Sequence, residues 1–151
     1  MKKHKKNTND NIIEEAICLA SKDPNNIVQA FSIIGIAMMD DVSVYVPVQV
    51  PKDWETYRTT MRSDYILKDT DGTSWIPVFT RQSKMTSEKD VIALKASLMS
   101  VMKYAYISDQ LEGLVINPHH LQMKFPKDML KMLFYTIEET EKQMGEESES
   151  D

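Results

Sequence analysis

The sequence predicts a single-domain α+β protein with a mixed or antiparallel sheet, a central hairpin, and helices before, between and after the strands. Two observations support this class. Apolar residues recur at helical spacing near both ends of the chain, and runs rich in β-branched residues lie between them. With 151 residues, 42% of them apolar and 27% charged, the chain has the size and composition of one globular domain.

The apolar pattern of the N-terminal part of the chain predicts two helices. In residues 11–20 apolar side chains return every three or four positions, and Asp10 is placed as the N-cap. A break at residues 21–25, which include a proline, ends this helix. A second helix follows over residues 27–38, with an apolar stripe wide enough to predict a well-buried helix. Residues 1–10 carry four lysines and are predicted to form a flexible basic head.

The middle of the chain predicts strands. Residues 42–48 alternate and are rich in β-branched side chains, so they indicate a strand. Two strand-like runs, 65–68 and 74–79, flank Asp71-Gly72, a pair that supplies the positive φ angles of a tight hairpin turn. We therefore predict a hairpin here. Residues 52–64 show no period and are interpreted as a variable connection.

Beyond the hairpin, the pattern is mixed. Residues 80–85 predict a short helix capped by the Thr80 hydroxyl. Residues 91–96 fit either a strand or the opening of the next helix, since periodicity cannot decide for so short a run. Residues 98–106 then carry a clear helical stripe.

The C-terminal part predicts two strands, a helix and a tail. Residues 111–118 form a compact apolar strand closed by a turn, because a proline at position 118 biases its neighbour away from helix. Residues 121–125 indicate a short edge strand, and Pro126 suits the first turn of a last helix. The domain is placed at 11–140, and the acidic residues 141–151 are predicted to be disordered.

Four pieces in this order resemble the N-terminal domain of the SseB family, named for enhanced serine sensitivity. They are Val44-Tyr45-Val46-Pro47, Asp71-Gly72 leading into Trp75-Ile76-Pro77-Val78-Phe79-Thr80, Glu112-Gly113-Leu114-Val115-Ile116-Asn117-Pro118, and the closing helix after Phe125. The resemblance covers residues 27–134. It implies a bacterial α+β domain with no established enzymatic activity or catalytic residue set. Longer members carry a second, C-terminal domain, whose role is not carried over to this chain.

The charge distribution excludes several classes of partner. The formal charge is −5, and from Glu138 onward seven acidic residues are accompanied by one lysine, Lys142. No basic stripe is present that could neutralise phosphates, so we expect no nucleic-acid partner. No apolar run approaches the roughly 20 residues that span a bilayer, and no apolar core of a signal peptide follows the basic head. We therefore expect no membrane partner and a cytoplasmic location.

The sequence shows no catalytic constellation. There is no Gly-x-Ser-x-Gly turn and no glycine-rich phosphate loop, and the adjacent pair His119 and His120 would diverge on a strand. Turn chemistry explains Asp69 and Asp71 without a metal ion. We predict no catalytic residue, no metal site and no cofactor; a catalytic role of the two histidines is the alternative.

The candidate site lies where two predicted strands end. Thr80 and Arg81 follow the hairpin, and Asn117 and His119 follow the late strand. If these strands are neighbours, a hydroxyl, a guanidinium, an amide and an imidazole would converge, as in many binding sites. The alternative is local: Thr80 caps a helix and Asn117 makes a turn. Arg81 is the residue that local structure explains least.

These observations predict a non-catalytic binding module in a bacterial cytoplasm, acting in protein–protein interaction or regulation with an unknown protein partner. The alternative is a sensor of a small molecule, an amino acid or another metabolite. An enzyme ranks third. An exposed apolar patch beside the hairpin would favour the interaction module, and a closed polar pocket would favour the sensor.

Overall fold

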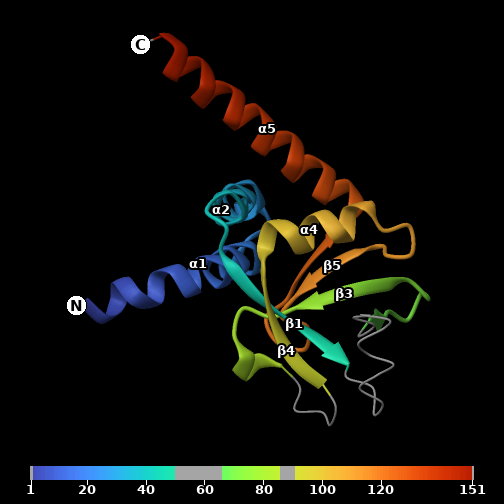
Figure 1. Cartoon of the computed structure of the whole chain (residues 1–151). Coiled ribbons are helices and arrows are strands. Elements are labelled where there is room, and N and C mark those ends of the chain that lie inside the picture. Colours follow the sequence, from blue (N-terminus) through green and yellow to red (C-terminus); the bar gives the residue numbers. More distant parts are fainter. Residues whose placement is uncertain (1, 50–65, 86–90, 151) are drawn as a thin grey trace, which may run out of the picture.

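The computed structural model describes residues 2–49, 66–85 and 91–150. Four helices and two sheets make up this part of the chain, so the predicted α+β class is confirmed (Figure 1). The elements in chain order are α1 (Lys2–Lys22), η1 (Pro24–Asn26), α2 (Ile27–Met39), β1 (Ser43–Gln49), β2 (Leu67–Lys68), β3 (Ser74–Val78), η2 (Gln82–Lys84), β4 (Val91–Ser97), α4 (Leu98–Ile107), β5 (Gly113–Ile116), β6 (Met123–Pro126) and α5 (Lys127–Ser150).

The larger sheet has the strand order β2-β3-β5-β6. Strands β2 and β3 form the predicted antiparallel hairpin, in which Gly72 has a φ of 87°. Strands β3 and β5 run parallel, and β6 is the predicted edge strand, antiparallel to β5. Because Val78 pairs with Ile116 in the parallel register, the chain leaves β3 and β5 at the same edge of the sheet. The two strand ends that carry the candidate site are therefore neighbours.

The smaller sheet is the antiparallel pair β1–β4. Residues 91–97 are a strand, which decides between the two sequence-based interpretations of residues 91–96. A bridge joins β1 to the end of β3: the Tyr45 amide donates to the Phe79 carbonyl, and the Phe79 amide donates to the Tyr45 carbonyl, each at 2.8 Å. This bridge brings the β1–β4 pair alongside the strand ends of the larger sheet.

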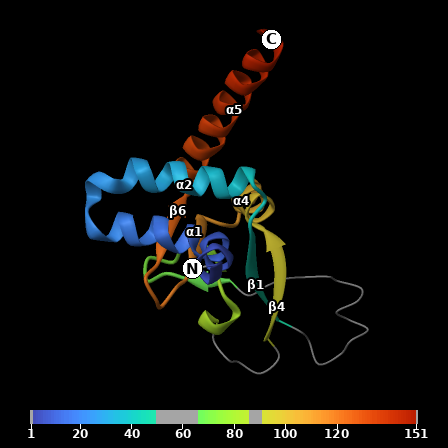
Figure 2. The same ribbon diagram turned by 90° about the vertical axis from the view of Figure 1, so that its left-hand side faces the viewer.

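The core lies between the sheets and the four helices. Helices α1 and α2 lie antiparallel, side by side (Figure 2). The rings of Phe31 and Phe125 stack with centroids 6.2 Å apart. Gly113 has no room for a side chain, because a Cβ would lie 2.1 Å from the Phe125 carbonyl oxygen. The largest fully buried side chains are Ile13, Ile17, Ile34, Met38, Val44, Leu98, Met102, Leu114, Ile116, Phe125, Leu130 and Leu133.

Both terminal helices are longer than predicted. Helix α1 begins at Lys2, so Asp10 lies inside it and the prediction of an N-cap there is wrong. Helix α5 continues to Ser150, through the residues predicted to be disordered. Residues 2–10 contain neither Pro nor Gly, and the tail is rich in Glu, so intrinsic propensity permits helix in both segments. Figure 1 shows the far ends of both helices pointing away from the body.

Helix α2 is less buried than its composition predicts. Ala30, Ile34, Ala37 and Met38 are buried, but Val28 on the opposite side is largely exposed. The predicted connection at 52–64 and the start of the hairpin at residue 65 lie outside the described residues. None of the described helices is both long and apolar enough to cross a membrane.

Candidate functional site

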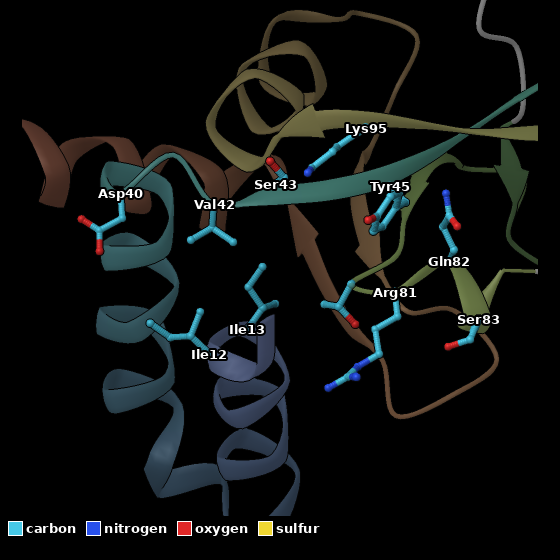
Figure 3. A pocket seen from close by; sticks show the side chains of 11 residues that line it. Ile12, Ile13, Asp40, Val42, Ser43, Tyr45, Arg81, Gln82, Ser83 and Lys95 are labelled. Atoms are coloured by element: carbon cyan, nitrogen blue, oxygen red, sulfur yellow. The ribbon is translucent and has the colours of Figure 1, made fainter. Parts of the chain in front are cut away.

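A pocket of about 660 Å³ opens between α1, the C-terminal end of α2, the β1–β4 pair and the segment after β3 (Figure 3). We call it the polar pocket. Its size is in the range of small-molecule sites, and polar or charged side chains form most of its wall. Its lining residues are Ile12, Ile13, Asp40, Val42, Ser43, Tyr45, Thr80, Arg81, Gln82, Ser83 and Lys95.

Thr80 and Asn117 meet beneath the polar pocket. The Asn117 side-chain oxygen accepts from the Thr80 backbone amide at 3.0 Å, and the Asn117 amide donates to the Thr80 hydroxyl at 3.0 Å. Only 6% of Thr80 and 2% of Asn117 is exposed. Asn117 has a φ of 55°, which suits asparagine, and its backbone amide donates to the Val78 carbonyl at 2.8 Å. The predicted meeting of the two strand ends is confirmed, but Asn117 supports the pocket from below instead of lining it.

A carboxylate from α1 joins this cluster. Glu14 Oε2 accepts from the Thr80 hydroxyl at 2.6 Å and from Arg81 Nε at 2.8 Å. The prediction that the Thr80 hydroxyl caps a helix is wrong, since the residue at the N-cap of η2 is Arg81 and it makes no side-chain cap bond. The hydroxyl bonds the carboxylate because a charged acceptor makes a stronger hydrogen bond than a neutral one.

These bonds have a defined direction. A threonine hydroxyl has one proton, which the nearby Glu14 carboxylate accepts, so the Asn117 amide must donate to the hydroxyl oxygen. The order is therefore Asn117 amide to Thr80 hydroxyl to Glu14 carboxylate, with Arg81 donating to the same carboxylate oxygen. This chain of hydrogen bonds holds Arg81 at the mouth of the pocket.

The wall facing Arg81 comes from β1 and β4. Tyr45 and Lys95 are directly paired in the register, so their side chains share one face of the ribbon with Ser43. Figure 3 shows Lys95 and Tyr45 on this wall, with Arg81 across the pocket. Within the described part of the chain Lys95 forms no ion pair. Lys95 is also exposed.

The remaining wall is apolar. Ile12 and Ile13 from α1 and Val42 from the start of β1 line it, and Ile13 is also part of the core. Asp40, at the C-cap of α2, places an exposed carboxylate on the rim. The pocket therefore combines an apolar wall with hydroxyl groups and charged groups of both signs.

His119 does not line the polar pocket. It is exposed, has a φ of 70°, and lines a smaller hollow of about 180 Å³ with Trp75, Lys124 and other residues next to the hairpin. The hypothesis that His119 and Arg81 share a site is therefore wrong, because the two residues line different hollows. The turn at Asn117-Pro118 directs the two residues toward different surfaces. Among the described residues, no three His, Cys, Asp or Glu side chains are grouped as a metal site.

Sequence reasoning missed Glu14, Tyr45 and Lys95. Glu14 flanks the apolar stripe of α1, which predicts a half-buried position but does not indicate its partners, 66 and 67 residues away. The direction of the Lys95 side chain could not be predicted as long as residues 91–96 fitted a helix as well as a strand. Pairing with Tyr45 across β1 and β4 decides which way it faces.

Comparison with models of protein families, with curated proteins and with solved structures finds no match for this chain. The resemblance to the SseB family, with the bacterial origin it implies, stays a prediction from the sequence motifs.

Proposed function

We propose that this chain is a non-catalytic binding module whose polar pocket receives a small molecule with an anionic group, such as a carboxylate or phosphate. The observation that carries the proposal is the position of Lys95. Its ammonium group lies at a pocket of ligand size and has no ion-pair partner in the described chain.

The rest of the pocket fits such a ligand. Arg81 adds a second positive charge, although Glu14 already engages its Nε, so Lys95 is the main contact for the anion. The hydroxyl groups of Ser43, Tyr45 and Ser83 can donate to the ligand's oxygen atoms. The apolar wall can cover a short carbon skeleton, which is how most small-molecule sites combine affinity with orientation.

Two observations favour binding over catalysis. Thr80, the hydroxyl at the centre of the cluster, is buried and already bonded to both Asn117 and Glu14. The pair His119 and His120, the candidate acid–base groups in the sequence, lies outside the lining of the pocket. The side chains nearest the pocket are thus suited to hold a ligand in place.

The pocket favours the sensor among the two sequence-based hypotheses. It is polar, as expected for a sensor of an amino acid or metabolite, but it is open instead of closed. The interaction module would use an exposed apolar patch beside the hairpin, and it does not depend on a ligand in the polar pocket.

Thermal unfolding of the purified chain against inorganic phosphate, dicarboxylates, amino acids and nucleotides tests the proposal. A compound at a hundred times its dissociation constant adds about 2.7 kcal/mol of stability, which raises the midpoint by about 5–10 °C. The Lys95→Ala variant should bind that compound about tenfold more weakly, so the shift should fall by about half. Lys103→Ala, which removes an exposed lysine of α4 outside the pocket, is the matched control.

Two results would contradict the proposal. A panel with no shift would exclude an anionic ligand among the compounds tested, and an equal shift in wild type and Lys95→Ala would place the ligand elsewhere. Arg81→Ala separates the two cations: a folded Arg81→Ala protein that binds normally would show that Lys95 acts without Arg81.

A further inference from the structure

A second hollow, of about 360 Å³, lies between α2 and α5. We call it the α2–α5 groove. Its lining is mostly apolar, in contrast to the polar pocket, with which it shares no lining residue. The residues are Ile27, Val28, Phe31, Ser32, Met129, Met132 and Thr136.

Three of the five apolar side chains of the groove are exposed, and Phe31 and Met129 are half-buried. Val28 is 72% exposed and Met132 is 59% exposed, and Ile27 is exposed as well. Helix α2 has no charged residue along its whole length, and the only polar side chain it contributes to the groove is the hydroxyl of Ser32. A contiguous exposed apolar surface of this kind marks a place where another apolar surface docks. Methionine suits such a surface because its flexible side chain adapts to different partners.

An acidic arm extends from one wall of the groove. Ile137 is the last buried residue among the part of α5 whose side chains are described, up to residue 145, and beyond it the helix leaves the body (Figures 1 and 2). Glu139 lies one turn beyond Thr136, on the groove side of the helix by its spacing. From Glu138 to the end the sequence carries seven acidic residues and one lysine, Lys142. The groove therefore opens toward a strongly negative helix.

We propose that the α2–α5 groove docks an amphipathic helix of another protein, with its apolar face on Val28 and Met132 and its basic residues beside the acidic arm. Helix-in-groove recognition needs a hydrophobic groove that accepts anchors spaced at i, i+3, i+4 and i+7. Charge complementarity with the arm selects a basic helix over an acidic one and increases the rate of association.

Charge and composition argue against a second copy of this chain as the occupant. The exposed part of α5 in a second copy is itself acidic, so it would be repelled by the arm. The basic segment of α1, residues 2–10, consists of Lys, His, Asn, Thr and Asp, and it has no aliphatic or aromatic side chain to fill an apolar groove. A basic helix with an apolar face must therefore come from a different protein.

The test uses the full chain and three synthetic helical peptides as probes. The first has leucines at i, i+3, i+4 and i+7 and lysines on its flanks. The second has the same composition in permuted order, so that no apolar stripe forms, and the third has the flanking lysines replaced by glutamine. Fluorescence anisotropy should show the first peptide binding at least about tenfold more tightly than either of the others.

Variants locate the binding surface. The double variant Val28→Ser with Met132→Ser should weaken binding of the first peptide by at least about tenfold, because both anchor contacts are lost. Ile107→Ser is the matched control: Ile107 is 73% exposed, lies on α4 and does not line the groove. It should leave binding unchanged.

Three results would overturn the inference. If the permuted peptide bound as tightly as the first, recognition would not depend on an apolar helix face. If the double variant bound as well as the Ile107→Ser control, the groove would not be the docking surface. Sedimentation could also reveal a dimer that the double variant abolishes, which would make a second copy the occupant.

Discussion

The two ends of β3 are held by different kinds of contact. At its start, the Thr73 amide and hydroxyl both donate to the Asp71 carboxylate, and the Gly72 amide donates to the Asp69 carbonyl. These bonds join residues two or three positions apart, in an exposed turn. At its other end, Thr80 bonds residues 37 and 66 positions away, in a buried cluster.

The contacts at the start of β3 can be predicted from neighbouring residues, whereas the contacts at its other end depend on the tertiary fold. A turn closes a short loop with its own side chains, so its chemistry is visible in a few neighbouring residues. The cluster around Thr80 exists only after β3, β5 and α1 have come together. Because its groups are buried, losing one partner leaves another polar group without a hydrogen bond, which costs more than the loss of an exposed bond. We therefore expect larger effects at the cluster than at the turn.

The largest effect is expected for Asn117→Ala. The substitution removes the acceptor of the Thr80 amide and the donor to the Thr80 hydroxyl, and it puts alanine at a φ of 55°. The free energy of unfolding should fall by about 2–4 kcal/mol, measured by urea denaturation. A loss below about 0.5 kcal/mol would mean that water replaces the amide at little cost.

A double-mutant cycle with Thr80→Val sharpens this prediction. Thr80→Val removes the hydroxyl shared by Asn117 and Glu14 but keeps the backbone amide. Since the two side chains are direct partners, the losses should not add, and the interaction energy should be about 0.5–3 kcal/mol. Additive losses would show that the two groups contribute independently.

A smaller effect is expected for Gly72→Ala in the turn. Gly72 has a φ of 87°, and no atom lies within 4 Å of the position that an alanine Cβ would take, so the cost is conformational rather than steric. The loss should be about 1 kcal/mol by the same denaturation assay. Gly72→Asn is the matched control and should lose less, because asparagine tolerates a positive φ better than alanine. Equal losses of stability in the two variants would show that the positive φ at position 72 is not the cause.

The smallest effect is expected from acid titration of the turn. Lys124 lowers the pKa of Asp69 mainly through a side-chain hydrogen bond, and the Thr73 hydroxyl lowers the pKa of Asp71. A depressed carboxylate pKa stabilises the fold at pH values above the unfolded value of 3.8, and this contribution is lost as the pH falls through the lower folded pKa. Asp71 is exposed and Asp69 is only half-buried, so solvent screens the effect.

Denaturation midpoints at decreasing pH measure this contribution. Asp69→Asn should flatten the dependence of stability on pH below 3.8, because the variant has no charge to lose at that position. Lys124→Met, which removes the partner but keeps an apolar chain over Trp75, should flatten it similarly. An unchanged slope in both variants would show that other carboxylates govern the acid response.

Prediction from sequence succeeded where the signal was local or periodic. Asp71-Gly72 identified the hairpin, and the stripe over residues 98–106 identified α4. It failed where burial depends on distant packing: Val28 is exposed although α2 is apolar throughout, because only one side of the helix meets the core. It anticipated that Thr80 and Asn117 would meet, yet it placed His119 with them, since it could not tell which way the chain turns after Asn117.

The residue pattern alone was enough to predict the class of fold and the hairpin, and to predict that the two strand ends meet if their strands are neighbours. Each of these follows from side-chain periodicity or turn chemistry within a few residues. Three features became visible only in the folded chain: Glu14 bonds Thr80 and Arg81, Lys95 lines the polar pocket, and a groove lies between α2 and α5. The reason is physical: these arrangements join segments far apart in the chain, and no local preference specifies which distant surface a side chain will meet.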